Sequence, residues 1–104
     1  MRLVDLKLDV ARLAGLCQHY GVDKLEAFGS FVRGDAKTES DLDLLVTYTP
    51  GRQIGLEFVE LQQELETLAG RHVDLLTRAS VERSPNKYFR RFALRETEPL
   101  YERA

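Results

Sequence analysis

Cysteine, long apolar runs and low-complexity linkers are all scarce in this sequence. The single cysteine, Cys17, cannot form an intramolecular disulfide and fits a reducing compartment. No apolar run approaches the length of a membrane-spanning helix, and the charged, helix-like start is not typical of a signal peptide. No internal repeat or Ser/Pro-rich linker divides the chain. We therefore expect a single cytoplasmic domain over residues 1–104.

The charged residues are distributed unevenly along the chain. Its 104 residues are 43% hydrophobic and 31% charged, which is ordinary for a globular domain with a modest core. Residues 1–77 carry eight Lys and Arg against thirteen Asp and Glu, a net charge of −5, whereas residues 78–104 carry seven against four, a net of +3. The basic tail therefore either faces an acidic partner or forms a solvated helix face with internal salt bridges.

Hydrophobic periodicity predicts three helices of useful length. Apolar residues at steps of three and four predict an N-terminal helix that ends near Gly21 and a second long helix that ends at Gly70. A last, basic helix is expected over residues 85–98, with Tyr88 and Phe92 packed on the sheet. All three patterns are typical of helices that cover a sheet with one apolar face.

Shorter apolar segments between these helices predict strands. We expect strands over residues 24–28, 41–48 and 72–77, with a helical turn and a polar loop over 31–38. Helices then alternate with strands along the chain. This order predicts an α/β fold, a single domain with a small mixed β-sheet flanked by α-helices, whose functional core spans residues 24–77.

Two acids begin the middle strand, although strands usually avoid aspartate. Asp41 and Asp43 are two positions apart, so they point to one face of the strand at a separation of about 6–7 Å. Two carboxylates this close repel each other unless a cation lies between them, and Mg²⁺ prefers such hard oxygen ligands. Asp74 lies in a later apolar strand and joins the same face if the two strands pair.

A Gly-Ser pair precedes these acids. Gly29 and Ser30 lie between a strand and a helical turn, where a glycine lets backbone amides approach a phosphate closely. The Ser30 hydroxyl adds a further donor. Together with the acids, these parts predict a site for a nucleoside triphosphate, with donors on the phosphates and carboxylates on the metal.

The segment AFGSFVRGDAKTESDLDLLV, from Ala27 to Val46, resembles the signature of the polymerase beta-like nucleotidyltransferase superfamily, and most closely its minimal nucleotidyltransferase (MNT) branch. The resemblance implies transfer of a nucleoside monophosphate from ATP to a hydroxyl group, with two Mg²⁺ ions as cofactors. It implies that Asp41, Asp43 and Asp74 are catalytic and hold the metal. It also implies that Gly29, Ser30 and Arg33 bind the nucleotide.

MNT proteins resemble antitoxins that pair with HEPN-domain toxins. The resemblance thus implies a HEPN-domain RNase as the partner, neutralised by adenylylation of a tyrosine hydroxyl. One alternative is an antitoxin that acts by occlusion without catalysis, and another is an enzyme that modifies a small molecule such as an antibiotic. The short chain disfavours the last, since the motif strands and helices leave no second domain for the acceptor. The acidic site also disfavours a nucleic-acid substrate.

Structural roles compete with these functional ones. The paired acids could protect an exposed edge strand, Ser30 could cap the following turn, and Arg33 could only pair with Asp35 or Glu39. Asp74 could likewise be a structural or exposed acid. His19 and His72 have no metal-ligand spacing to each other or to Cys17, which disfavours a zinc site, and Cys17 itself is expected in the core.

Overall fold

The structure is a computed structural model that describes residues 1–52 and 55–103. The expected domain 1–104 includes Gln53, Ile54 and Ala104, which lie outside the described residues. In chain order the elements are η1 (Leu3–Leu6), α1 (Val10–His19), β1 (Val22–Phe28), α2 (Ser30–Arg33), β2 (Leu42–Tyr48), α3 (Leu56–Ala69), β3 (Val73–Thr77), α4 (Arg78–Glu82), α5 (Lys87–Arg95) and β4 (Glu98–Glu102).

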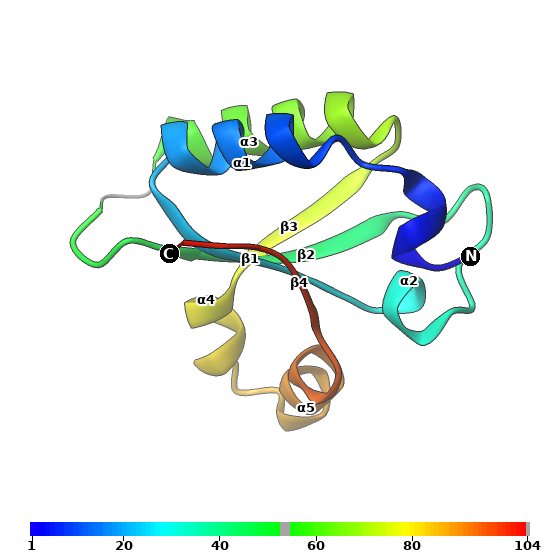
Figure 1. The fold of residues 1–104 in the computed structure, drawn as a ribbon. Coiled ribbons are helices and arrows are strands. Elements are labelled where there is room, and N and C mark those ends of the chain that lie inside the picture. The colour runs from blue at the N-terminus through cyan, green and yellow to red at the C-terminus, as the bar shows by residue number, and fades with distance from the viewer. Residues whose placement is uncertain (53–54, 104) are drawn as a thin grey trace.

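Within these residues the strands form one mixed sheet in the order β3-β2-β1-β4. β1 pairs with both β2 and β4 in antiparallel orientation, whereas β2 and β3 are parallel and are joined through α3. Helices cover both faces of the sheet. Figure 1 shows α1 and α3 side by side on one face and α4 and α5 on the other, with α2 at the end of β1. This confirms the predicted α/β fold with a small mixed sheet.

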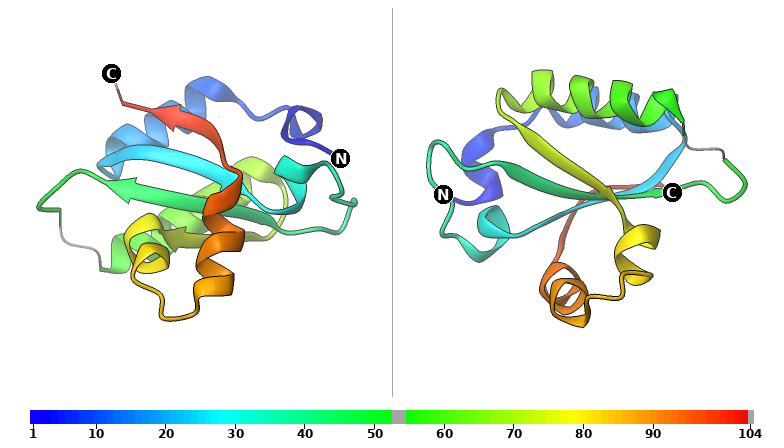
Figure 2. Two further views of the ribbon diagram at one scale, coloured as in Figure 1. Left: turned by 90° about the horizontal axis from the view of Figure 1, so that it is seen from below. Right: turned by 180° about the vertical axis from the view of Figure 1, so that it is seen from behind.

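The two faces of the sheet carry separate hydrophobic clusters, because side chains alternate along each strand. Leu25, Leu44 and Val73 point toward α1 and α3, where they pack with Leu13 and Leu61 in the larger cluster. The opposite face, which α4 and α5 cover in the views of Figure 2, has a smaller cluster. That smaller cluster comprises Phe28, Leu45, Val81 and Ala93. Cys17 is fully buried in the larger cluster, as predicted.

The N-terminal helix is not continuous, contrary to the prediction. Lys7 has a left-handed backbone with φ of 50°, which ends η1. Asp9 then caps a new helix, its carboxylate accepting a hydrogen bond from the backbone N–H of Arg12. The apolar spacing runs through this break, so periodicity alone indicates one helix where there are two. Val10 belongs to this apolar spacing, yet its side chain is 71% exposed.

The C-terminal region differs most from the prediction. The basic helix α5 ends at Arg95, and the chain continues into β4, which pairs with β1 through residues such as Tyr101 and Glu98. Tyr88 and Phe92 do not pack on the sheet, since they are 72% and 51% exposed; Ala93 is the buried residue of α5.

No helix among the described residues has both the length and the apolar character needed to span a bilayer.

Candidate active site

Parallel pairing of β2 and β3 brings two of the predicted acids side by side. Asp43 and Asp74 are directly opposite each other in the register of the two strands. Their neighbours Leu42, Leu44 and Val73 are buried on the face toward α1 and α3. Both carboxylates therefore lie on the face that α4 and α5 only partly cover. The expected position of Asp74 beside the first two acids is confirmed.

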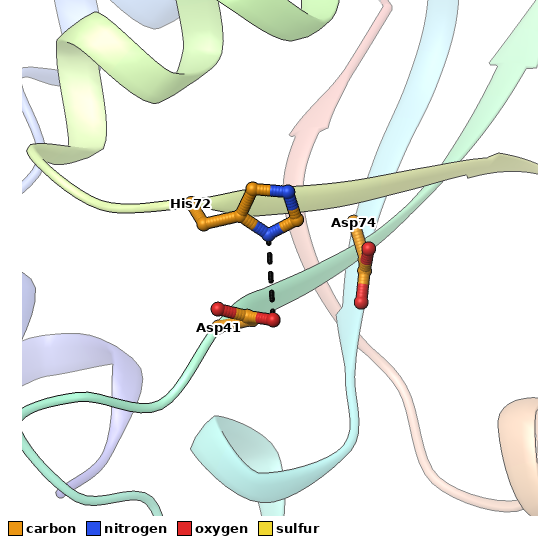
Figure 3. Close-up of side chains that lie close together, drawn as sticks. All are labelled: Asp41, His72 and Asp74. Carbon is orange, nitrogen blue, oxygen red and sulfur yellow. Dashed lines mark ion pairs between the residues drawn. The ribbon is translucent and has the colours of Figure 1, made fainter.

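Asp41 and His72 extend this cluster one step before the strands begin. The Leu42 backbone N–H donates to the His72 carbonyl over 3.0 Å, which holds the two strand starts together. His72 Nδ1 lies 3.3 Å from Asp41 Oδ2, the pair joined by the dashed line in Figure 3. One ligand atom each from Asp41, His72 and Asp74 lies within 4.8 Å of the others. All three side chains are exposed and accessible to a ligand.

His72 is the residue of this cluster that the sequence did not predict. Its spacing to His19 and Cys17 argued against a zinc site, and that spacing says nothing about carboxylates. The informative signal is its position two residues before Asp74, since residues at i and i+2 of a strand share a face. His72 Nε2 also lies 3.7 Å from Glu66 Oε2 on α3.

The surroundings of Asp43 raise the pKa of its carboxyl group. The pKa of its carboxyl group is raised to about 6, chiefly by burial and then by the negative charge of Asp74 and a hydrogen bond between the two side chains. The charge of Asp41 acts in the same direction, whereas the Arg33 guanidinium opposes the rise. Carboxylates held this close favour a proton or a cation between them.

Gly29 lies against Asp43 with no room for a side chain. Its φ of 79° is in the range that side-chain-bearing residues rarely adopt, and a Cβ there would overlap Oδ2 of Asp43. The backbone N–H groups of Val32 and Arg33 both donate to the Gly29 carbonyl and so form the turn that follows. Gly29 is the N-cap of this turn and Ser30 is its first helical residue, so Ser30 does not occupy the capping position. Gly29 and Ser30 thus border the acids.

Several side chains hold the α2 turn and its loop in place. Arg2 Nη1 donates to the Val32 carbonyl over 2.9 Å, and the N-terminal amine donates to the Ala36 carbonyl over 2.6 Å. From the other side, Arg71 Nη1 donates to the carbonyls of Thr38 and Ser40, each over 3.0 Å. The segment between Ser30 and Asp41 is therefore fixed by contacts from both ends of the fold.

Arg33 makes two contacts beside this turn. Its Nε lies 3.4 Å from Oδ2 of Asp35, so the predicted pairing with Asp35 is present, although both side chains are substantially exposed. Its guanidinium carbon also lies 5.1 Å from the centre of the Phe92 ring on α5, a cation–π geometry. The Arg33 guanidinium therefore lies between the motif and the C-terminal helix.

The donor set fits a divalent cation. Asp41, His72 and Asp74 offer ligand atoms within 4.8 Å of one another, and Asp43 lies opposite Asp74 on the neighbouring strand. Asp43 ionises with difficulty in the absence of a compensating positive charge. Oxygen ligands of this kind suit Mg²⁺, and the His72 nitrogen would add a ligand that Mn²⁺ or Zn²⁺ accepts more readily. Asp41, Asp43 and Asp74 are the side chains that would hold the ion.

Comparison with known proteins points to one family. Residues 13–100 match the family model described as a nucleotidyltransferase domain. The chain is 42% identical over 66 residues to the protein adenylyltransferase MntA of Thermococcus cleftensis. This match covers 64% of the present chain and 66% of the relative, just under two thirds of its length.

Solved structures agree with this match. One described as a minimal nucleotidyltransferase is 35% identical, with a TM-score of 0.71 over 95% of this chain and 96% of its own. Another contains an AMPylated HEPN toxin of Shewanella oneidensis in complex with an MNT antitoxin, with a TM-score of 0.60 over 93% of this chain and 72% of the other. At 18% identity the second shows a shared fold alone.

Proposed function

Because this chain belongs to the nucleotidyltransferase domain family, we propose that it is a Mg²⁺-dependent enzyme that transfers AMP from ATP to a hydroxyl group of a partner protein. One observation carries the proposal: Asp41, Asp43 and Asp74 gather from two strands and the segment before them, directly beside the turn at Gly29. A scaffold of this size has no structural need for three adjoining carboxylates, which cost stability through mutual repulsion.

Each of these residues has a proposed role in the reaction. Gly29 and Ser30 bind the triphosphate through the backbone and the Ser30 hydroxyl, and Arg33 contributes positive charge from the next turn. Asp41 and Asp43 would hold Mg²⁺, with Asp74 as a third ligand. The bound ions, two in the two-metal arrangement, would neutralise charge that develops on the phosphate oxygens.

The transfer itself is a displacement at the α-phosphorus. The acceptor oxygen forms a bond to that atom, while the bond from it to the oxygen bridging toward the β-phosphate breaks, and pyrophosphate leaves with the electron pair. Asp74 is exposed beside Asp43 and accepts the proton of the acceptor hydroxyl. AMP then remains esterified to the acceptor.

We further propose that the acceptor is a tyrosine of a HEPN-domain toxin, so that this chain acts in the cytoplasm as its antitoxin. The relatives support this proposal: one is named as a protein adenylyltransferase, and another structure pairs an MNT antitoxin with an AMPylated HEPN toxin. The open arrangement of the acids also supports a large acceptor, because Asp41 and Asp74 are exposed rather than enclosed.

A label-transfer assay tests the proposal. The full chain is incubated with Mg²⁺, ATP labelled at the α-phosphate and proteins that co-purify with it from the source cell. We expect one partner band to take label with the wild type and to lose it with Asp41→Asn/Asp43→Asn. Mass spectrometry of that band would then identify a modified tyrosine.

The matched control is Glu39→Gln/Glu64→Gln, which removes two exposed carboxylates outside the acid cluster and leaves the Asp35–Arg33 pair intact. It should label the partner as well as the wild type does. If the partner co-purifies equally with wild type and the Asp41→Asn/Asp43→Asn variant and neither labels it, catalysis is excluded as the means of neutralisation. Occlusion by binding is then the better account.

A further inference from the structure

A cleft joins the Gly-Ser turn to the C-terminal helix. It has a volume of about 220 Å³ and is lined by Gly29, Arg33, Phe92, Arg95 and Glu96. The backbone of Gly29 also lies against the carboxylate of Asp43, so the cleft opens beside the acid cluster. The C-terminal end of α5 therefore forms one wall of the space that borders the proposed nucleotide site.

Positive charge dominates the walls of this cleft. Arg33 approaches from α2 and Arg95 from the last turn of α5. In the part of the chain that the structure describes, no carboxylate lies within 4.0 Å of the Arg95 guanidinium. Glu96 lines the same space without pairing with either arginine there. An exposed arginine without an ion-pair partner, facing a cleft, is available to an anion.

Phe92 explains how the first arginine keeps its orientation. The Arg33 guanidinium carbon lies 5.1 Å from the centre of the Phe92 ring, while the ring remains 51% exposed. Stacking on an aromatic face restricts a flexible arginine without using its N–H donors. Those donors stay free for the cleft apart from Nε, which faces Asp35.

We propose that Arg95 is a second phosphate-binding arginine, acting with Arg33 on the β- and γ-phosphates of the nucleotide, and that Phe92 positions Arg33 for this contact. The inference rests on the proposed nucleotidyltransferase function. The cleft is too small to enclose a whole nucleoside triphosphate, but it can take the phosphate end. The acids bind the metal on one side of Gly29, and the two guanidinium groups balance the phosphate charge on the other.

The test compares nucleotides of different phosphate number. Dissociation constants are measured with Mg²⁺ for AMP and for an ATP analogue that cannot be cleaved because a methylene group bridges its α- and β-phosphorus. Arg95→Gln should weaken binding of the ATP analogue about tenfold, the loss expected for one charge-assisted contact, and leave AMP binding unchanged. Arg95→Lys should retain most of the affinity because it keeps the charge.

Other variants sharpen this result. Phe92→Leu should weaken the ATP analogue about threefold, again without an effect on AMP. Glu96→Gln removes the opposing charge from the cleft and should tighten binding of the ATP analogue. The matched control is Arg91→Gln on the same helix, which removes the same charge outside the cleft and should leave both constants unchanged. Thermal unfolding of each variant checks that the fold is intact.

Four outcomes would overturn the inference. Wild-type affinity for the ATP analogue in Arg95→Gln would show that this side chain binds no phosphate. An equal loss of AMP and analogue binding, or an equal effect of Arg91→Gln, would show a general electrostatic or structural role. If the wild type transfers AMP while Arg95→Gln binds normally, only the role of Arg95 is lost. If the wild type binds no nucleotide with Mg²⁺, the proposed function fails and this inference fails with it.

Discussion

The two faces of the sheet have different roles in the molecule. The face toward α1 and α3 is apolar, with Leu25, Leu44 and Leu61 almost inaccessible to solvent. The face toward α4 and α5 has a small apolar cluster and carries Asp43 and Asp74 on the same strands. One face therefore supplies most of the buried apolar area that stabilises the fold, and the other leaves space and charge for chemistry.

A buried charge shows how the second face is held together. Glu26, on β1, is 2% exposed. Arg78 at the start of α4 donates to it over 2.8 Å, and the Thr97 hydroxyl donates over 2.9 Å from the segment after α5. These contacts attach both ends of the α4–α5 region to the sheet where apolar contacts are few. Polar contacts on this face replace part of the packing that the other face has.

The largest loss of stability is expected from a substitution on the apolar side of the sheet. Leu61→Ala should lower the free energy of unfolding by about 3 kcal/mol, because it removes buried methyl groups and leaves a cavity. The side chain is fully buried between α3 and the sheet. Urea denaturation measures the change. Label transfer per folded molecule should stay near that of the wild type, since the acids lie on the other face.

Leu56→Ala on the same helix is the matched control, because Leu56 is 83% exposed. It should change the free energy of unfolding by less than about 0.5 kcal/mol. Equal destabilisation by the two variants would mean that this face does not supply the dominant packing. The contrast between the faces would then be wrong.

A smaller effect is expected from the buried charge of the second face. Glu26→Gln should lower the free energy of unfolding by about 2 kcal/mol, because it breaks a buried charge-assisted pair and leaves the Arg78 guanidinium without its inner partner. Urea denaturation again measures it. Glu82 is the outer partner of the same arginine, and its side chain is 54% exposed. Glu82→Gln should therefore lower the free energy of unfolding by less than about 0.5 kcal/mol. Similar losses in both variants would contradict an anchoring role for Glu26.

The central part of this organisation was predictable from local patterns. Alternation in the segments 41–48 and 72–77 indicates which residues share a face, and it correctly separated Asp43 and Asp74 from Leu44 and Val73. The turn at Gly29 followed from the requirement for a glycine between a strand and a helical turn. Such features depend on a few neighbouring residues, which is why the sequence suffices for them.

The remaining features depend on contacts between distant segments. β4 contains Pro99 and two glutamates, so its sequence does not favour a strand, and pairing with β1 determines its structure. The exposure of Phe92 was missed because an amphipathic helix indicates which side is apolar but not which residues find a partner. His72 reaches Asp41 only because two strands pair in parallel.

The smallest effect concerns the cost of the acid cluster itself. Asp43→Asn should raise the free energy of unfolding by about 1 kcal/mol at neutral pH without divalent cations. Burial and the nearby acids raise the pKa of Asp43 from 3.8 to about 6, so its ionised form destabilises the folded state. The expected gain in the free energy of unfolding is small because Asp43 is only half-buried and solvent screens its charge. Glu39→Gln neutralises an exposed carboxylate nearby and should change little.

The pH dependence gives this prediction its sign. Between about pH 4 and about pH 6 the folded state keeps a proton on Asp43 that the unfolded state has lost, so this group lowers wild-type stability as pH rises through that window. The advantage of Asp43→Asn should therefore vanish below about pH 4, where Asp43 is protonated in both states. Excess MgCl₂ should stabilise the wild type more than the variant, because the ion neutralises the same charge. If Asp43→Asn remains more stable than the wild type at low pH, and Mg²⁺ does not change the difference, then packing rather than charge distinguishes the two side chains. The sheet face toward α4 and α5 would then carry no electrostatic strain.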